Sequence, residues 1–111
     1  MIDIKALVSS TGLTIRATRL VDKVPANGRP YCVLFDNEEL IGPDFAPGML
    51  RRHSQTIEHY DYKIDSESRL ALESALASAG LEYTRSDTEW LQQEKVYQTL
   101  FNFQQMEKRS L

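Results

Sequence analysis

The sequence predicts an α+β fold in which a helix packs on one face of a small mixed or antiparallel β-sheet. Residues 65–79 place their apolar side chains at helical spacing and are followed by Gly80, a residue type that commonly ends a helix. Residues 96–104 alternate instead with the period of two that is typical of a strand. Each element has one apolar face, and a helix packed on a sheet is the smallest unit that buries both.

The predicted helix, residues 65–79, has recognisable ends. Asp65 or Ser66 can act as its N-cap, because a short side chain with an oxygen atom accepts a hydrogen bond from a backbone N–H that the first turn leaves unpaired. Glu67 adds a negative charge near the positive end of the helix dipole. We expect the apolar stripe of the helix to pack on the aromatic face of the last strand. The stripe consists of Leu72, Ala75, Leu76 and Ala79, and the face of Tyr97, Thr99, Phe101 and Phe103.

The N-terminal half predicts a short helix and three strands. The helix covers residues 2–10 and has one apolar side. The strands are expected at residues 13–17, 31–35 and 56–64. The second of these strands is apolar throughout, as is typical of a strand covered on both faces. The complete order is α-β-β-β-α-β-β, and we expect residues 1–111 to form a single domain with a polar, frayed C-terminal tail at residues 106–111.

An extended loop is expected at residues 36–54, because Gly42-Pro43 and Pro47-Gly48 break regular structure. The segment nevertheless carries several large apolar side chains, which a solvated loop does not need. Either these side chains fold back on the domain or they cover a neighbouring molecule. The candidate interface residues are Leu40, Ile41, Phe45, Met49 and Leu50, with Arg51, Arg52 and Trp90 at the rim.

The predicted sheet carries apolar side chains on both faces, so it needs two covers. One cover is the helix at residues 65–79. The other is either the N-terminal helix or a second subunit. Trp90 lies among polar residues in a predicted turn region, where it is either an interface residue or a cap over the end of a hairpin.

The overall composition limits the class of protein. Of the 111 residues, 41% are hydrophobic and 26% are charged, which indicates a soluble, globular chain. No apolar run approaches the roughly 20 residues of a membrane helix, and the first residues lack the features of a signal peptide. The single Cys32 excludes an internal disulfide and a zinc site built from cysteines. A net charge of −3 argues against a protein that wraps nucleic acid.

The sequence contains no motif for a catalytic nucleophile, a phosphate-binding loop or a dinucleotide, and we predict no catalytic, cofactor or metal site. His53, His59 and Asp61 are the combination that most favours chemistry, because they share one face of an extended chain. No ligand spacing repeats, however, and histidines and acids are common on strand surfaces. A small metal-binding domain or enzyme that uses these three residues is kept as an alternative, which metal analysis of the purified protein tests.

Several pieces of the sequence occur in a characteristic order. They are Ile57-Glu58-His59-Tyr60 in a strand, the acid-started helix at residues 65–79, Gly80, and Glu94-Lys95-Val96-Tyr97-Gln98 in a hairpin. Together they resemble the small neck proteins of long-tailed bacteriophages and prophages that are called tail-completion or tail-terminator (tail-to-head joining) proteins. Thr11-Gly12-Leu13 and Pro30-Tyr31 fit the first half of that pattern, whereas residues 37–53 depart from it.

The resemblance implies a structural virion protein without enzymatic activity and without a cofactor. Members of this family form a ring, commonly a hexamer, that terminates the tail tube at its head-proximal end. The implied partners are further copies of the chain, the tail tube protein and the head-side connector protein. DNA would pass through the channel without specific binding, and no membrane is involved. The implied location is the neck of the virion, after assembly in the cytoplasm of the bacterial host.

Two further functions stay open. A different neck ring, such as a head-completion or adaptor protein, is distinguished from the tail terminator by the number of subunits in the particle. A regulator that contacts DNA is disfavoured by the net charge of −3, and a salt-dependent shift on DNA would reveal it.

Overall fold

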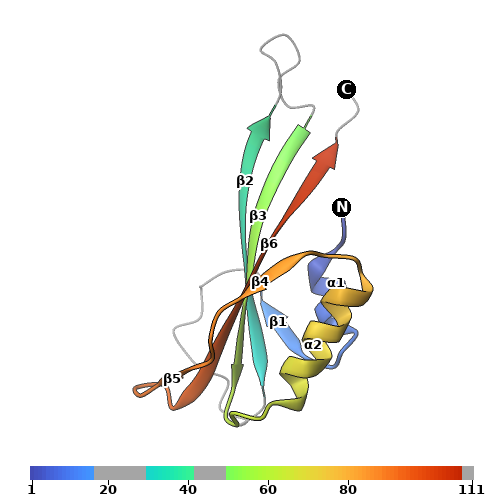
Figure 1. Cartoon of the computed structure of the whole chain (residues 1–111). Helices are drawn as coiled ribbons and strands as arrows, with labels where there is room; N and C mark the ends of the chain where they lie inside the picture. The colour runs from blue at the N-terminus through green and yellow to red at the C-terminus, as the bar shows by residue number, and fades with distance from the viewer. Residues whose placement is uncertain (17–29, 42–49, 109–111) are drawn as a thin grey trace.

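The computed structural model describes residues 1–16, 30–41 and 50–108, which fold into two helices and six strands (Figure 1). Their order is α1 (Ile4–Ser9), β1 (Thr14–Arg16), β2 (Tyr31–Ile41), β3 (Leu50–Asp61), α2 (Glu67–Ser78), β4 (Tyr83–Arg85), β5 (Glu89–Leu91) and β6 (Val96–Lys108). This confirms the predicted α+β class. Three strands follow α2, whereas the sequence predicts two, because β4 and β5 are short and lie in a region rich in polar residues.

The strands form one mixed sheet in the order β1-β2-β3-β6-β4, and β5 also pairs with β6. The pairing of β1 with β2 is parallel, and the other pairings are antiparallel. The middle strand of the sheet is β3, which pairs along nearly its whole length with both β2 and β6. Residues that lie opposite one another in this register project from the same face, so the register decides which side chains meet.

Both helices cover the same face of the sheet (Figure 1). Leu72 and Leu76 of α2 are fully buried, as the predicted stripe requires, and α1 adds Ile4 and Val8 to the same core. The alternative in which the N-terminal helix covers the opposite face is therefore wrong. The chain turns back at Gly12, shortly after α1, and this turn keeps α1 beside α2. The sheet contributes Cys32, Leu34, Ile57, Phe101 and Phe103 to the core.

The ends of α2 follow the predicted chemistry. Ser66 is the N-cap, and its Oγ accepts a hydrogen bond from the backbone N–H of Arg69 at 3.0 Å. At the other end Gly80 has a φ of +76°, a left-handed conformation that favours glycine, and the N–H of Leu81 bonds to the carbonyl of Leu76 at 3.1 Å. Neither of the two described helices has the length and apolar character needed to cross a membrane.

The hairpin of β2 and β3 is longer than the sequence predicts, since the two strands pair out to Ile41 opposite Leu50. The prediction of an extended loop at residues 36–54 is therefore wrong for every residue of that range that the structure describes. Cross-strand charges take the place of the alternating apolar pattern that identifies a strand. Arg51 forms an ion pair with Glu38, and Arg52 forms one with Glu39.

The strand β6 also continues to Lys108, so the prediction of a frayed tail from residue 106 is wrong up to that point. Residues 36–41, 50–55 and 104–108 form a three-stranded extension of the sheet, here called the arm. The arm projects beyond both helices (Figure 1). Residues 42–49, which include the candidates Phe45 and Met49, and residues 109–111 lie outside the part of the chain that the structure describes.

Candidate functional site

The described apolar candidates lie on the arm and outside the core. Leu40 is 60% exposed, and Ile41 and Leu50 are half-buried opposite one another. None of the three belongs to the core that the helices cover. Met106 of β6, which the sequence did not single out, is a further exposed large side chain on the arm at 49%. Their role as interface residues stays a prediction.

The three candidates at the rim do not lie together. Arg51 and Arg52 project from opposite faces of β3, and each is paired within the chain, with Glu38 and Glu39 respectively. Trp90 belongs to β5 and lies opposite Tyr97, near the end of β6 that is farthest from the arm. At about 3.3 Å per residue, roughly 23 Å of strand separates Tyr97 from Gln104, where the arm begins on β6.

Trp90 partly caps the hairpin of β5 and β6. Its ring lies 4.7 Å from that of Tyr97, measured between centroids, and its Nε1–H donates to Gln92 at 3.0 Å. The side chain remains 45% exposed, so this packing covers only part of it. Both predicted roles of Trp90 are therefore compatible with its position.

The metal-binding combination of His53, His59 and Asp61 is wrong. The three side chains share one face of β3 as predicted, but six residues of strand separate the two histidines, which is about 20 Å. His53 bonds to Asp36, whereas His59 bonds to Ser68 of α2. The two imidazoles therefore belong to different sites.

The site around His59 contains histidine, serine and aspartate, but its hydrogen bonds are not those of a catalytic triad. Nε2 of His59 lies 2.8 Å from Oγ of Ser68, whereas the Asp61 carboxylate accepts hydrogen bonds from Ser66 and Ser68. In a triad the aspartate instead holds the histidine ring. Burial lowers the pKa of His59 to about 4, which makes it a weak base at neutral pH. This network attaches the first turn of α2 to β3.

His53 is the centre of a second polar cluster, which lies midway along the arm. The imidazole is only 5% exposed, and its Nδ1 lies 2.9 and 3.0 Å from the two carboxylate oxygens of Asp36. Glu38 lies directly opposite it on β2, and Glu107 approaches from β6 with an oxygen 3.5 Å from Nε2. The hydrogen bond to Asp36 raises the pKa of His53 despite its burial, and the charges of Asp36 and Glu107 add to this effect.

Sequence reasoning missed this cluster because its acids come from a predicted loop and a predicted tail. The signal that could have found it is the period of two in Asp36 and Glu38, which places both carboxylates on one face of an extended chain. Only the register of β2, β3 and β6 shows that this face is also the face of His53.

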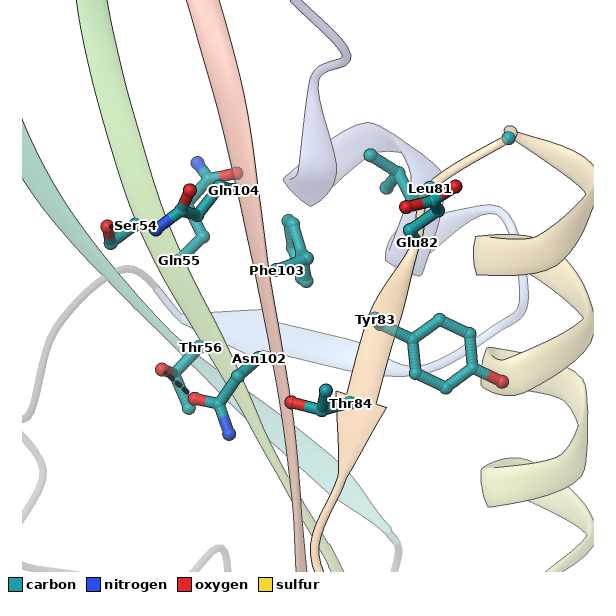
Figure 2. A pocket seen from close by; sticks show the side chains of 11 residues that line it. Ser54, Gln55, Thr56, Leu81, Glu82, Tyr83, Thr84, Asn102, Phe103 and Gln104 are labelled. Atoms are coloured by element: carbon teal, nitrogen blue, oxygen red, sulfur yellow. Dashed lines mark hydrogen bonds between the residues drawn. The ribbon is translucent and has the colours of Figure 1, made fainter.

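A groove of about 790 Å³ runs beside β6 where β4 approaches it (Figure 2). Its described lining is mixed polar and apolar and includes Gln55, Tyr83, Asn102 and Phe103. Glu82 is the one charged side chain among the described lining residues. The described lining thus lacks the convergent charged groups that are typical of a catalytic pocket.

The face of the sheet opposite the helices carries its own ring contact. Tyr31 and Tyr60 stack with 4.8 Å between their centroids, and the Tyr60 hydroxyl donates to Glu58 at 2.7 Å. Neither described helix lies on this face. That a second subunit covers this face stays a prediction.

No protein-family model matches this chain, and no curated protein matches it. Among solved structures, the chain is similar to one from the virion of a native gene transfer agent particle. The match has a TM-score of 0.57 and covers 91% of this chain and 81% of that chain, with 16% sequence identity. At this identity the comparison shows a shared fold.

Proposed function

We propose that this chain is a structural virion protein of a long-tailed phage or a related particle. In this proposal it forms a ring, commonly a hexamer, at the head-proximal end of the tail, terminates the tail tube and joins it to the head-side connector. Two findings support a virion role: the fold is shared with a chain from a gene transfer agent virion, and the sequence motifs resemble those of tail-terminator proteins. The proposed activity is assembly without a chemical step.

The arm is the observation that carries the ring proposal. The structure pairs β1 with β2 only at residues 31–33, and β4 with β6 only at residues 101–103. No described strand therefore pairs with the outer edge of β2 at residues 36–41 or with that of β6 at residues 104–106. Long strand edges in native proteins are usually covered or paired. In a ring, the β2 edge of one subunit meets a different edge, that of β6, on the next subunit.

The charge balance is compatible with a channel for DNA. A net charge of −3 per chain is multiplied by the number of subunits in a ring. The resulting field repels the phosphate backbone rather than binding it. DNA would then slide through such a ring without being held.

The virion role is tested by gold-antibody labelling of particles from the source phage or induced prophage, viewed by negative-stain electron microscopy. We expect label at the head–tail junction or on the blunt end of free tails. Protein that is present only as free soluble chain, with no particle labelled, would refute the virion role. The number of subunits per particle then separates the tail-terminator ring from other neck rings.

The role of the arm is tested by two matched substitutions. Leu40→Ser removes an exposed apolar side chain from the arm, and Leu70→Ser removes an equally exposed one from α2, at 60% and 59% exposure. Both variants should fold, because neither side chain lies in the core. We expect Leu40→Ser to reduce the joining of heads to tails and Leu70→Ser to leave it unchanged. Equal joining by the two variants would remove Leu40 from the interface.

The edge pairing is tested by disulfide trapping in assembled particles. Asn37 of β2 and Gln104 of β6 are exposed and project from the same face of the sheet. A chain with Asn37→Cys and Gln104→Cys should form cross-linked oligomers on oxidation, whereas each single variant should not. Dimers from Asn37→Cys alone would instead indicate that two β2 edges pair with one another.

A further inference from the structure

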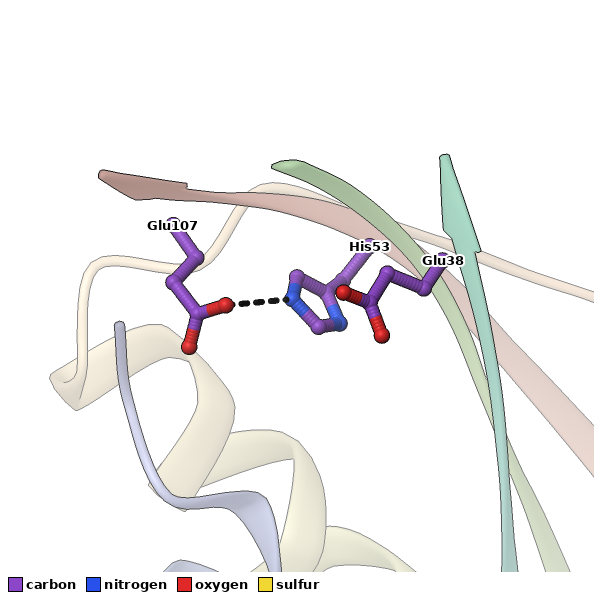
Figure 3. A group of neighbouring side chains, drawn as sticks. All are labelled: Glu38, His53 and Glu107. Carbon is purple, nitrogen blue, oxygen red and sulfur yellow. Dashed lines mark ion pairs between the residues drawn. The ribbon is translucent and has the colours of Figure 1, made fainter. Parts of the chain in front are cut away.

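The cluster around His53 has the chemistry of a metal site. It gathers one imidazole and two carboxylates, from Glu38 on β2, His53 on β3 and Glu107 on β6. The three strands are neighbours in the sheet, so the backbone already holds these residues together. Figure 3 shows the two carboxylates on either side of the imidazole ring.

The hydrogen bond between Nδ1 of His53 and Asp36 fixes the orientation of the imidazole ring. A carboxylate can only accept a hydrogen bond, so Nδ1 of His53 carries the proton that is shared with Asp36 at 2.9 Å. Nε2 is therefore the nitrogen whose lone pair can coordinate a metal ion. Metal-binding histidines almost always donate their other ring N–H to a carboxylate or a carbonyl in this way. Asp36 would therefore be the residue that positions the ligand.

Nε2 of His53 is buried without a hydrogen-bond partner among the described residues. Its nearest acidic neighbour, the Glu107 carboxylate, lies at 3.5 Å, which is longer than an ordinary hydrogen bond. Burying a nitrogen away from water without a hydrogen-bond partner lowers the stability of the fold. A cation bound at Nε2, with the carboxylates turned toward it, would supply that partner.

The spacing of the three residues is close to that of a first coordination sphere. One ligand atom from each of Glu38, His53 and Glu107 lies within 4.8 Å of the others. An ion at about 2.0–2.2 Å from each ligand needs those atoms within about 4 Å, which small rotations of the glutamates provide. Arg51 contacts Oε1 of Glu38, so the second oxygen of that carboxylate can face the ion.

We propose that Glu38, His53 and Glu107 bind a divalent transition-metal ion, with Zn²⁺ as the best match. Imidazole together with carboxylates suits Zn²⁺ better than Mg²⁺, which prefers ligand sets made of oxygen alone. The ion would join β2, β3 and β6 midway along the arm and make the arm more rigid. This proposal does not depend on the virion role and can be tested on the purified chain alone.

The test is a calorimetric titration of the metal-free chain with ZnCl₂ near pH 8, compared with MgCl₂. We expect one Zn²⁺ per chain, a rise in the temperature of unfolding, and no comparable effect of Mg²⁺. Glu107→Gln and His53→Gln should abolish binding at the Zn²⁺ concentration that saturates the original chain. Asp36→Asn, which weakens only the positioning contact, should reduce the affinity about 10- to 100-fold.

Adjacent glutamates on β2 provide a matched control. Glu38→Gln and Glu39→Gln each remove one charge that is paired with an arginine, but Glu39 projects from the opposite face. Glu38→Gln should weaken Zn²⁺ binding and Glu39→Gln should not. Because both residues are exposed, both variants should fold even where His53→Gln does not. Absence of saturable binding, or equal binding by the two variants, would overturn the proposal.

Discussion

Acidification should destabilise the protein through His59. The imidazole is buried on β3, and its pKa falls from an ordinary 6.5 to about 4, first because of burial and further because of the nearby Arg69, against the opposing charge of Asp61. Between these two pH values the unfolded chain binds a proton at this residue and the folded chain does not. The stabilising contribution is therefore complete above pH 6.5 and is lost as the pH falls to about 4.

The size of this effect follows from the shift in pKa. One unit corresponds to about 1.4 kcal/mol, so the change at His59 is worth about 3 kcal/mol of the free energy of unfolding. Marginally stable domains have only about 5–15 kcal/mol in total, so the loss should be plain in denaturant curves.

The assay is urea unfolding followed by circular dichroism at several pH values between 4 and 8, with a chelator present. His59→Gln is expected to be less stable at neutral pH, because it disturbs the bond to Ser68, but to lose about 3 kcal/mol less on acidification. His53→Gln, a change to the other histidine, should lose as much free energy of unfolding between pH 6.5 and 4 as the original chain does. If the His59 variant and the original chain lost equal stability over that range, the imidazole would not be a buried neutral group.

Three further substitutions or treatments have defined outcomes. Leu72→Ala should cost about 2–5 kcal/mol in thermal or urea unfolding, because Leu72 is fully buried, whereas Leu70→Ala on the exposed side of α2 should cost under about 1 kcal/mol. Cys32, whose pKa burial raises to about 12, should react with a thiol reagent only as fast as the protein opens, and rapid labelling of the folded chain would contradict its burial. Ser66→Ala should cost about 1–2 kcal/mol and raise the pKa of Asp61, measurable by NMR titration, since it removes the N-cap and a hydrogen bond to that carboxylate.

The elements that the sequence determines are those with local signals. The helix α2 depends on the spacing of Leu72 and Leu76, on the Ser66 cap and on Gly80, and these residues lie within one short segment. The alternation of Phe101 and Phe103 in β6 is equally local. Each such pattern can be recognised without knowledge of the rest of the fold, because backbone geometry alone sets the period of a helix or a strand.

The arm and its polar cluster are decided by the tertiary structure. Asp36 and His53 are 17 positions apart, and Glu107 comes from the other end of the chain, so no short window of sequence contains the interaction. The segment around Glu38 and Arg51 lacks an alternating apolar pattern, and its strands exist because β3 supplies hydrogen bonds and opposite charges to its neighbours. A shift of one residue in that register would send every side chain to the other face. The candidate metal site is therefore a property of strand pairing, which the sequence encodes only through the whole fold.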